Sequence, residues 1–309
     1  MKTNINLLVL LCLIPLSLVR TVGSSASFRS QPVIAPGSTI AKGIAWLEAN
    51  QSTSGAWSGP TALRDTATAA QALGAAGGRG RGLWPALAWL ANRPARDNVE
   101  RARVLGVVGR PLVTDKLIAA LKAAQNPVDT TKTRPNAPEG GWGVATGYSS
   151  DILSTALALR ALSATTTADA KLSLAAGYLV AAQNVDGGWP AVRGDSSSVD
   201  MTSQVALSLL PFRNVAGVTA ALSKAQQFLL LRQKVGGGWG AGNGTAIETA
   251  QALRALRALN APAARSDKAR AFLVSLQDAN GSWNNRVYDT ALALIALSES
   301  RVHVPLVRL

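Results

Sequence analysis

Acidic residues recur at similar points along the chain, each near the start of a segment rich in Ala and Leu. They are Asp65, Asp151, Asp200, Glu248 and Asp289. A carboxylate at a helix start accepts hydrogen bonds from free backbone amides and faces the positive end of the helix. We therefore interpret most of these acids as helix caps. If they gather at one mouth, paired carboxylates also suit hydrolysis of glycosidic bonds, so a polysaccharide-active protein is one alternative.

Cysteine and histidine are nearly missing from the chain. Cys12 and His303 are single, and they lie near opposite ends of the sequence. Zinc sites are built from Cys, His and carboxylate ligands. We therefore expect no metal site and no cofactor.

A spacing of Leu, four residues later Gln, and then Gly-x-Trp occurs in five copies. Their Gln and Trp residues are Gln51 and Trp57, Gln125 and Trp142, Gln183 and Trp189, Gln233 and Trp239, and Gln277 and Trp283. We expect the Gln amide to bond the backbone at a helix end while the Trp ring covers it. The sequence therefore predicts that these residues hold neighbouring helices together.

Each copy lies between two apolar segments, which predicts a helix, a turn and a second helix. Such a pair cannot bury its apolar face alone, so neighbouring pairs must stack. A degenerate sixth pair is expected at 83–110, with Leu90 four residues before Pro94 instead of Gln and a second helix over 98–108. We expect Trp84 and Trp89 of this pair to be buried.

The spacing resembles the QW motif of the prenyltransferase and squalene-cyclase repeat family, over about residues 38–299. The resemblance implies an all-α fold, an α/α toroid of six helix-hairpin repeats with concentric inner and outer helices. An open arc is the alternative if the pair at 83–110 does not form.

Family members differ in function, so the matching residues must be compared motif by motif. Zinc prenyltransferases of this fold use an Asp, a Cys and a His, and thioester proteins a Cys-Gly-Glu-Gln segment, so both activities are excluded. Squalene-type cyclases protonate a polyene with the middle carboxylate of an Asp-x-Asp-Asp-Thr segment. Only Asp200 and Thr202 match that segment here, which makes Asp200 the candidate catalytic residue. Because its acidic neighbours are missing, we expect its pKa to be ordinary and its carboxylate to be ionised at neutral pH.

The ends of the chain suggest an exported protein. Residues 1–26 combine Lys2, an apolar run and a small-residue cleavage site, which is typical of a signal peptide. The apolar run is shorter than the roughly 20 residues of a membrane-spanning helix, which disfavours an uncleaved anchor. We expect a linker at 27–37, the toroid at 38–300 and a tail at 301–309. The predicted location is secreted or periplasmic.

Charge and repeat pattern together suggest the ligand. Of 31 basic residues, 29 follow the leader, against 17 acidic residues, which favours an anionic partner such as a lipid headgroup or cell-wall polymer. Basic residues gather around the degenerate pair as a solvated face: Arg79, Arg81, Arg93, Arg96, Arg101, Arg103 and Arg110. Nucleic acid is disfavoured, because the nearby Trp residues are expected to be buried. The first hypothesis is a toroid that binds an isoprenoid, lipid or polymer without catalysis, and the alternative is a divergent class II terpene cyclase.

Overall fold

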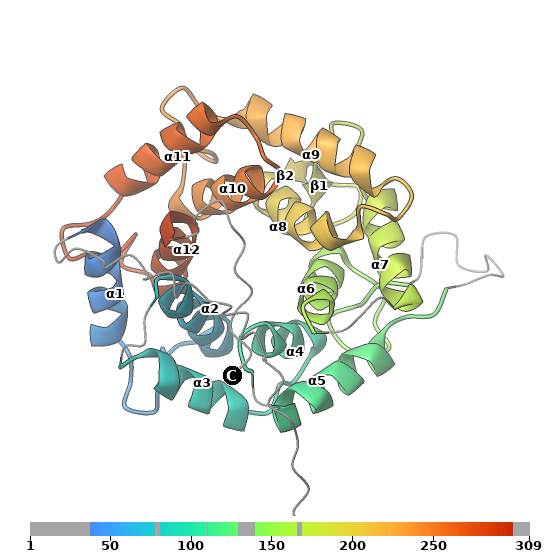
Figure 1. Cartoon of the computed structure of the whole chain (residues 1–309), viewed down its shortest axis with the longest axis horizontal. Coiled ribbons are helices and arrows are strands. Elements are labelled where there is room, and N and C mark those ends of the chain that lie inside the picture. Colours follow the sequence, from blue (N-terminus) through green and yellow to red (C-terminus); the bar gives the residue numbers. More distant parts are fainter. Residues whose placement is uncertain (1–37, 78–80, 110, 129–139, 166–168, 299–309) are drawn as a thin grey trace, which may run out of the picture. The chain divides into compact units, whose positions relative to one another are not determined.

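The computed structural model describes residues 38–77, 81–109, 111–128, 140–165 and 169–298. In these residues the chain alternates between an outer and an inner α-helix, six times in succession (Figure 1). The outer helices are α1 (Thr39–Ala49), α3 (Leu83–Asn92), α5 (Pro111–Ala124), α7 (Ala170–Ala181), α9 (Val218–Arg232) and α11 (Ala263–Ser275). The inner helices are α2 (Ala62–Ala75), α4 (Asn98–Leu105), α6 (Ile152–Ser163), α8 (Val199–Leu209), α10 (Ala246–Ala258) and α12 (Val287–Ser298). The all-α toroid is confirmed.

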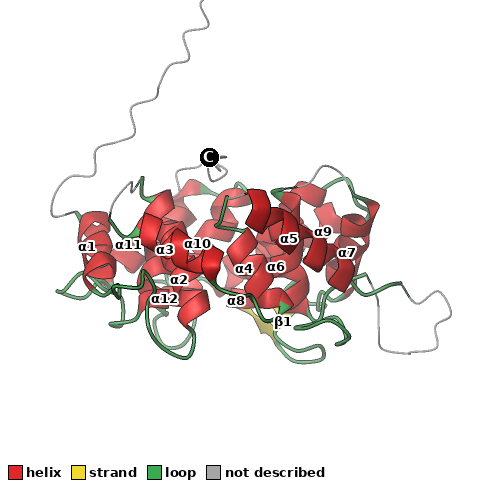
Figure 2. Cartoon of the chain, turned by 90° about the horizontal axis from the view of Figure 1, so that it is seen from below, coloured by secondary structure: helices red, strands yellow, loops and turns green. Residues whose placement is uncertain are grey.

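Little other regular structure interrupts the described helices. A two-residue strand β1 (Trp189–Pro190) pairs antiparallel with β2 (Ser197–Ser198), and a 3₁₀ turn η1 (Leu210–Phe212) extends α8. Seen from the side, the inner and outer helices lie at the same height, and the small hairpin lies at the face where α8 begins (Figure 2). The predicted signal peptide, linker and tail lie outside the described residues.

The last pair packs on the first, so the arc closes. α12 contacts both α1 and α2, and Gln277 Nε2 donates to the Thr39 carbonyl oxygen at 2.8 Å. The degenerate pair is present as α3 and α4, although α4 ends at Leu105, three residues earlier than expected. Gly106 follows as its C-cap. Six pairs therefore make a closed ring and exclude the open arc.

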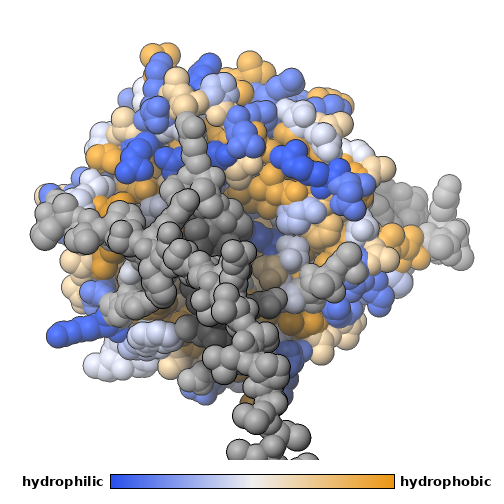
Figure 3. All heavy atoms as spheres, viewed as in Figure 1, coloured by the Kyte–Doolittle hydropathy of each residue, from blue (hydrophilic) through white to orange (hydrophobic). Residues whose placement is uncertain are grey.

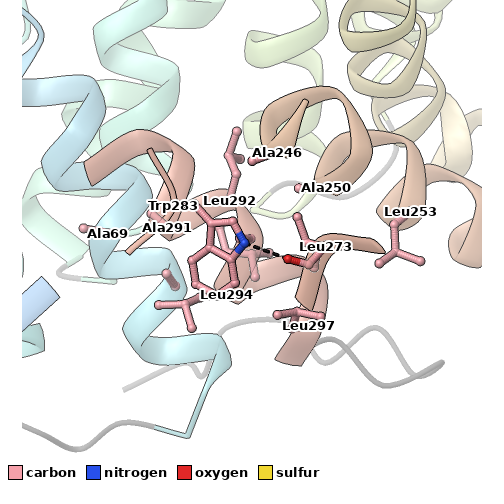
Figure 4. Close-up of a cluster of buried hydrophobic side chains, with 14 of the residues drawn as sticks. Ala69, Ala246, Ala250, Leu253, Leu273, Trp283, Ala291, Leu292, Leu294 and Leu297 are labelled. Carbon is pink, nitrogen blue, oxygen red and sulfur yellow. Dashed lines mark hydrogen bonds between the residues drawn. The ribbon is translucent and has the colours of Figure 1, made fainter. Parts of the chain in front are cut away.

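The repeated Trp residues hold each pair together from inside. Trp283 Nε1 donates to the Leu273 carbonyl oxygen at 2.8 Å, with its ring among buried Ala and Leu side chains (Figure 4). The same indole bond recurs from Trp57 to Leu47, Trp142 to Leu121, Trp189 to Leu179 and Trp239 to Leu229. In every copy the backbone N–H of the Trp donates to a Thr hydroxyl of the inner helix: Thr66, Thr155, Thr202, Thr249 or Thr290. The Thr202 that matches the cyclase segment is therefore a general feature of this repeat.

The repeated Gln residues join one pair to the next. Gln233 Nε2 donates to Gly237 O of its own turn at 3.1 Å and to Arg265 O of the next outer helix at 2.9 Å. Equivalent bonds reach the next outer element from Gln51, Gln125, Gln183 and Gln277. In each copy the Gln amide therefore links two successive helix pairs.

The degenerate pair differs from the expectation at its aromatic residues. Trp84 is 51% exposed, so the prediction that it is buried is wrong. Trp89 is only half-buried, and the Arg93 guanidinium carbon lies 4.7 Å from its ring centroid. Neither Trp occupies the place that the Gly-x-Trp indoles fill in the other pairs, because this pair lacks that turn.

Candidate functional site

The repeat itself shows which residues face the ring axis. In each inner helix with a Thr that holds the Trp, one position lies two residues before that Thr, and another lies two residues after it. These two positions are four residues apart, so they lie on the same helix face. The position before the Thr holds Arg64, Leu153, Asp200, Ile247 and Tyr288. The position after it holds Thr68, Leu157, Gln204, Gln251 and Leu292. In α4 the same count from the N-cap Asp97 places Val99 and Arg103 in these two layers.

Interactions between side chains of different inner helices indicate that the polar members meet at the axis. The Arg64 guanidinium carbon lies 4.2 Å from the Tyr288 ring centroid. Arg103 interacts electrostatically with Tyr288, although α2 separates α4 from α12 around the ring. Asp200 and Arg103 also interact electrostatically, although α6 separates α8 from α4. We call these residues, with Gln204, Gln251 and Arg254, the axial site.

Asp200 is the acid at the centre of this site. Its own helix is capped by Ser198, whose hydroxyl accepts from Met201 N, so Asp200 is not needed as a cap. Its Oδ2 accepts from Gln204 Nε2 at 3.0 Å, whereas Oδ1 is buried without a hydrogen-bond partner. Burial raises the pKa of this carboxyl, against the opposing effect of the Gln204 and Gln251 amides. The expectation of an ordinary pKa is therefore wrong, because it ignored desolvation of the carboxyl by burial in the folded ring.

The cations of the axial site come from three inner helices. Burial lowers the pKa of Arg103 and raises the pKa of the Tyr288 hydroxyl. Arg254 is only 4% exposed, and Arg64 forms an ion pair with Asp65 at 2.9 Å. Arg103 was expected on a solvated basic face, but α4 turns it inward to the axis.

The other helix-start acids have different roles. Asp151 is a helix cap, because its Oδ1 accepts from Ser154 N at 2.7 Å. Glu248 accepts from the hydroxyl of Thr245, and that Thr is the cap of α10. Asp289 is 3% exposed and accepts from Asn284 Nδ2 at 2.8 Å. Asp65 lies in the first turn of α2 and also accepts from the Thr61 hydroxyl. Asp151 therefore caps its helix, whereas the other four acids, Asp65, Asp200, Glu248 and Asp289, lie in the first turn of theirs.

Apolar side chains complete the axial layers. Val99, Leu153, Leu157 and Ile247 are half-buried, although the Thr residues between these layers are buried. Leu292 and Thr68 are buried beside them. One part of the axial surface is therefore aliphatic, and the other carries Asp200, the arginines and Tyr288.

The described residues contain no cluster of three or more His, Cys, Asp or Glu side chains that could hold a metal ion. Within the same residues, no helix is both long and apolar enough to cross a membrane. Hydrophilic and hydrophobic residues are interspersed around the visible rim of the ring (Figure 3).

Comparison with solved structures identifies the fold. The type II terpene cyclase MstE from Scytonema, solved as an R-to-A variant with geranylgeranyl dihydroxybenzoate as substrate, matches with a TM-score of 0.65 and 18% identity. The match covers 84% of this chain and 95% of that one. A protein from Actinoplanes matches with a TM-score of 0.61 and 18% identity, over 84% and 97% of the two chains. ent-Copalyl diphosphate synthase from Streptomyces platensis matches with a TM-score of 0.56 and 21% identity, over 77% of this chain and 51% of that one.

No family model matches the sequence, and no curated protein matches it. At these identities the solved structures show the fold alone. The chain therefore has a terpenoid cyclase-like α/α toroid fold, and its chemistry must be argued from its own axial residues.

Sequence reasoning found Asp200 but missed its partners at the axis, which come from α2, α4, α10 and α12. A signal was present, because aligning the copies on the repeated Thr places Arg64, Asp200 and Tyr288 at one position. That position changes residue type between copies while the Thr does not. A search for cyclase motifs alone could not detect it.

Proposed function

We propose that the ring binds an isoprenoid chain at its axis and that Asp200 donates a proton to one of its double bonds. The observation that carries this proposal is the Asp200 carboxyl, which faces the axis with a buried, unpartnered Oδ1 and a raised pKa. A raised pKa increases the protonated fraction of a carboxyl at a given pH, and the protonated form is the one that can act as a general acid. The function is thus a divergent class II terpene cyclase activity, the alternative that the sequence left open.

The surroundings of Asp200 suit both the protonated carboxyl before the proton transfer and the carboxylate after it. Before the transfer, burial favours the protonated form of the carboxyl by raising its pKa. After it, the amides of Gln204 and Gln251 and the charge of Arg103 favour the carboxylate that remains. These groups are in place before the reaction, so they need no rearrangement when the negative charge forms.

The reaction balances as an isomerisation. The electron pair of the double bond takes the Asp200 proton and leaves a carbocation on the neighbouring carbon. The next double bond attacks this cation and forms a carbon–carbon bond. Loss of a proton to water or to the Asp200 carboxylate ends the sequence and gives a cyclic isomer of the substrate.

The aliphatic axial residues provide the surface for the chain. Leu153, Leu157 and Ile247 are half-buried on the axial face, so covering them with a hydrocarbon chain removes apolar surface from water. A chain packed there also keeps water from the cation. The solved relatives named above include a cyclase with an isoprenoid substrate bound, which supports this choice of ligand.

The test is incubation with linear polyprenyl compounds, namely squalene, geranylgeraniol, geranylgeranoic acid and geranylgeranyl diphosphate, followed by gas chromatography and mass spectrometry. We expect a cyclic isomer from at least one compound and loss of that product in Asp200→Asn. Asp267→Asn is the matched control, because Asp267 is exposed on α11 and should keep full activity. Binding without any cyclic product would leave only the non-catalytic binding role, and a product retained in Asp200→Asn would exclude Asp200 as the donor.

We also propose that the toroid works outside the cytoplasm after removal of residues 1–26. The support is the apolar run with small residues at its end.

A further inference from the structure

The two axial positions of α8 hold an acid and an amide. Asp200 and Gln204 are four residues apart, and Gln204 Nε2 donates to Asp200 Oδ2 at 3.0 Å. An Asp and a Gln at this spacing lie on the same helix face and can form such a bond. In the other copies the two positions hold Arg64 and Thr68, Leu153 and Leu157, Ile247 and Gln251, and Tyr288 and Leu292. Among these copies, α8 alone combines an axial acid with an amide four residues later.

The hydrogen bond makes the two oxygens of the Asp200 carboxyl different. Oδ2 accepts from Gln204, whereas Oδ1 is buried and has no hydrogen-bond partner within the described part of the chain. The backbone of α8 does not need the carboxyl as a cap, because the Ser198 hydroxyl accepts from Met201 N. Buried polar atoms without a partner are few in folded proteins, and each one is costly. The protein therefore holds one oxygen of Asp200 and leaves the other without a bond.

This difference decides where a proton would lie on the carboxyl. A protonated carboxyl has one hydroxyl, which donates, and one carbonyl oxygen, which accepts. The carbonyl oxygen carries more negative charge than the hydroxyl oxygen, so it is the better acceptor for an amide N–H. A proton on Oδ1 keeps Oδ2 as the carbonyl oxygen and preserves the bond from Gln204. A proton on Oδ2 would weaken that bond.

We propose that Gln204 is a positioning residue, which directs the acidic proton of Asp200 to Oδ1 and leaves that O–H free to donate to the double bond of the substrate. The inference rests on the proposed function for the role of Asp200 as proton donor. It adds which oxygen donates and which residue selects that oxygen.

The same hydrogen bond favours the transfer itself. The Oδ1 proton moves to one carbon of the double bond, and the electron pair of the O–H bond stays on the carboxylate. The negative charge is then shared with Oδ2, so the bond from Gln204 becomes charge-assisted and stronger. The amide is already in place, so it need not reorient as the charge forms. Gln204 should therefore affect kcat more than KM.

Infrared spectroscopy tests the orientation of the carboxyl without turnover. The difference between wild type and Asp200→Asn, recorded down to the lowest pH at which both are folded, isolates the C=O stretch of protonated Asp200. A hydrogen bond to a carbonyl oxygen lowers its stretching frequency. Gln204→Met keeps the length of the side chain but lacks the N–H, so the band should move to higher frequency. An unchanged frequency in this variant, or no such band at any pH in wild type, would overturn the inference.

Gln226→Met is the matched control, because Gln226 Nε2 donates to the Leu259 carbonyl oxygen at 3.4 Å, away from Asp200. This variant should leave the Asp200 band unchanged. Gln204→Asn is a second variant in case Gln204→Met does not fold. It retains an amide but places it one methylene group farther from Oδ2, so the band should again move to higher frequency.

Turnover gives an independent measurement. We expect Gln204→Met to lower kcat for cyclisation by about 10- to 100-fold, as for loss of a hydrogen bond to a charged group, with KM nearly unchanged. Gln226→Met should keep the wild-type kcat. A raised KM with unchanged kcat would overturn the inference, because Gln204 would then bind the substrate instead of positioning Asp200. If no compound is cyclised, the proposed function fails, but the infrared shift would still support orientation of the carboxyl by Gln204.

Discussion

At the residue scale, two nearby positions of the inner helices differ in how much their residue type varies between the repeats. The Thr that accepts from the Trp backbone N–H is the same in five copies, and its role is structural. The residue two places earlier changes from Arg64 to Leu153, Asp200, Ile247 and Tyr288, and it faces the axis. The constant Thr therefore stabilises the helix pairs, whereas the variable position supplies different side chains to the axis of the ring.

The raised pKa of Asp200 predicts how the stability of the protein changes with pH. Its folded pKa lies above the unfolded value of about 4, so the protonated carboxyl contributes stability that is fully present below the unfolded pKa. This contribution is lost as pH rises through the folded pKa. Asp200→Asn cannot ionise and should therefore gain stability relative to the wild type as pH rises. Urea unfolding between about pH 4 and pH 8 measures the difference, and parallel curves for the two proteins would contradict a desolvated Asp200.

At the element scale, each helix pair is a unit whose parts are joined through one indole. The Trp side chain packs in the pair and its Nε1 bonds to the Leu carbonyl near the end of the outer helix. The next pair is joined through the Gln amide and a Gly turn that lies against the following outer helix. The degenerate pair has neither device, and its Trp residues remain partly exposed.

Trp239→Ala tests this joint. Trp239 is completely buried and its Nε1 donates to Leu229 O at 2.7 Å, so truncation should cost about 3–5 kcal/mol of unfolding free energy. Trp84→Ala is the control, since half of Trp84 is exposed, and should cost much less. Denaturant unfolding followed by circular dichroism gives both values. Equal losses would mean that the repeated Trp has no special structural role.

At the scale of the whole ring, closure depends on contacts between the last turn and the first helix. Gly281 adopts a φ of +94°, and a Cβ there would lie 2.5 Å from the Lys42 carbonyl oxygen of α1. The same close approach joins Gly237 to Lys268 within the chain. The seam between the two ends of the toroid is thus built like the other joints.

Gly281→Ala therefore tests closure of the ring, with Gly194→Ala as its control. Gly194 has a φ of +93° but nothing within 4 Å of an added Cβ. Both variants pay about 1–2 kcal/mol for a left-handed backbone, and Gly281→Ala should lose about 1–3 kcal/mol more through overpacking against α1. Thermal or urea unfolding compares them. An arc with a free end would give the two variants the same loss.

The export proposal also belongs to the whole chain. We expect the protein recovered outside the cell to begin near Ser27, because the small residues Ser24 and Ala26 precede that point. N-terminal sequencing of the secreted protein measures this. A secreted chain that still contains Lys2 would show that the leader is not removed.

The sequence by itself determined the helix pairs and their joints. The Leu–Gln–Gly–Trp spacing is local, and the groups it brings together, such as Trp239 Nε1 and Leu229 O, lie within about one hairpin of each other. Apolar periodicity and turn residues act over the same short range, so the five copies and even the degenerate pair could be found without coordinates. Asp200 could be identified as well, because its match to the cyclase segment depends only on residues next to it in the sequence.

Only the tertiary structure decided the environment of the Asp200 carboxyl and the direction of its pKa shift. Its pKa depends on desolvation and on charges that arrive from α4 and α10, tens of residues away in either direction. Arg103 illustrates the same limit: among its basic neighbours in the sequence it resembles a solvated surface residue, but closure of the ring turns it to the axis beside Tyr288. Local spacing determines the hydrogen bonds within a repeat. The axial site is made of side chains from different repeats, and these come together only when the ring is closed.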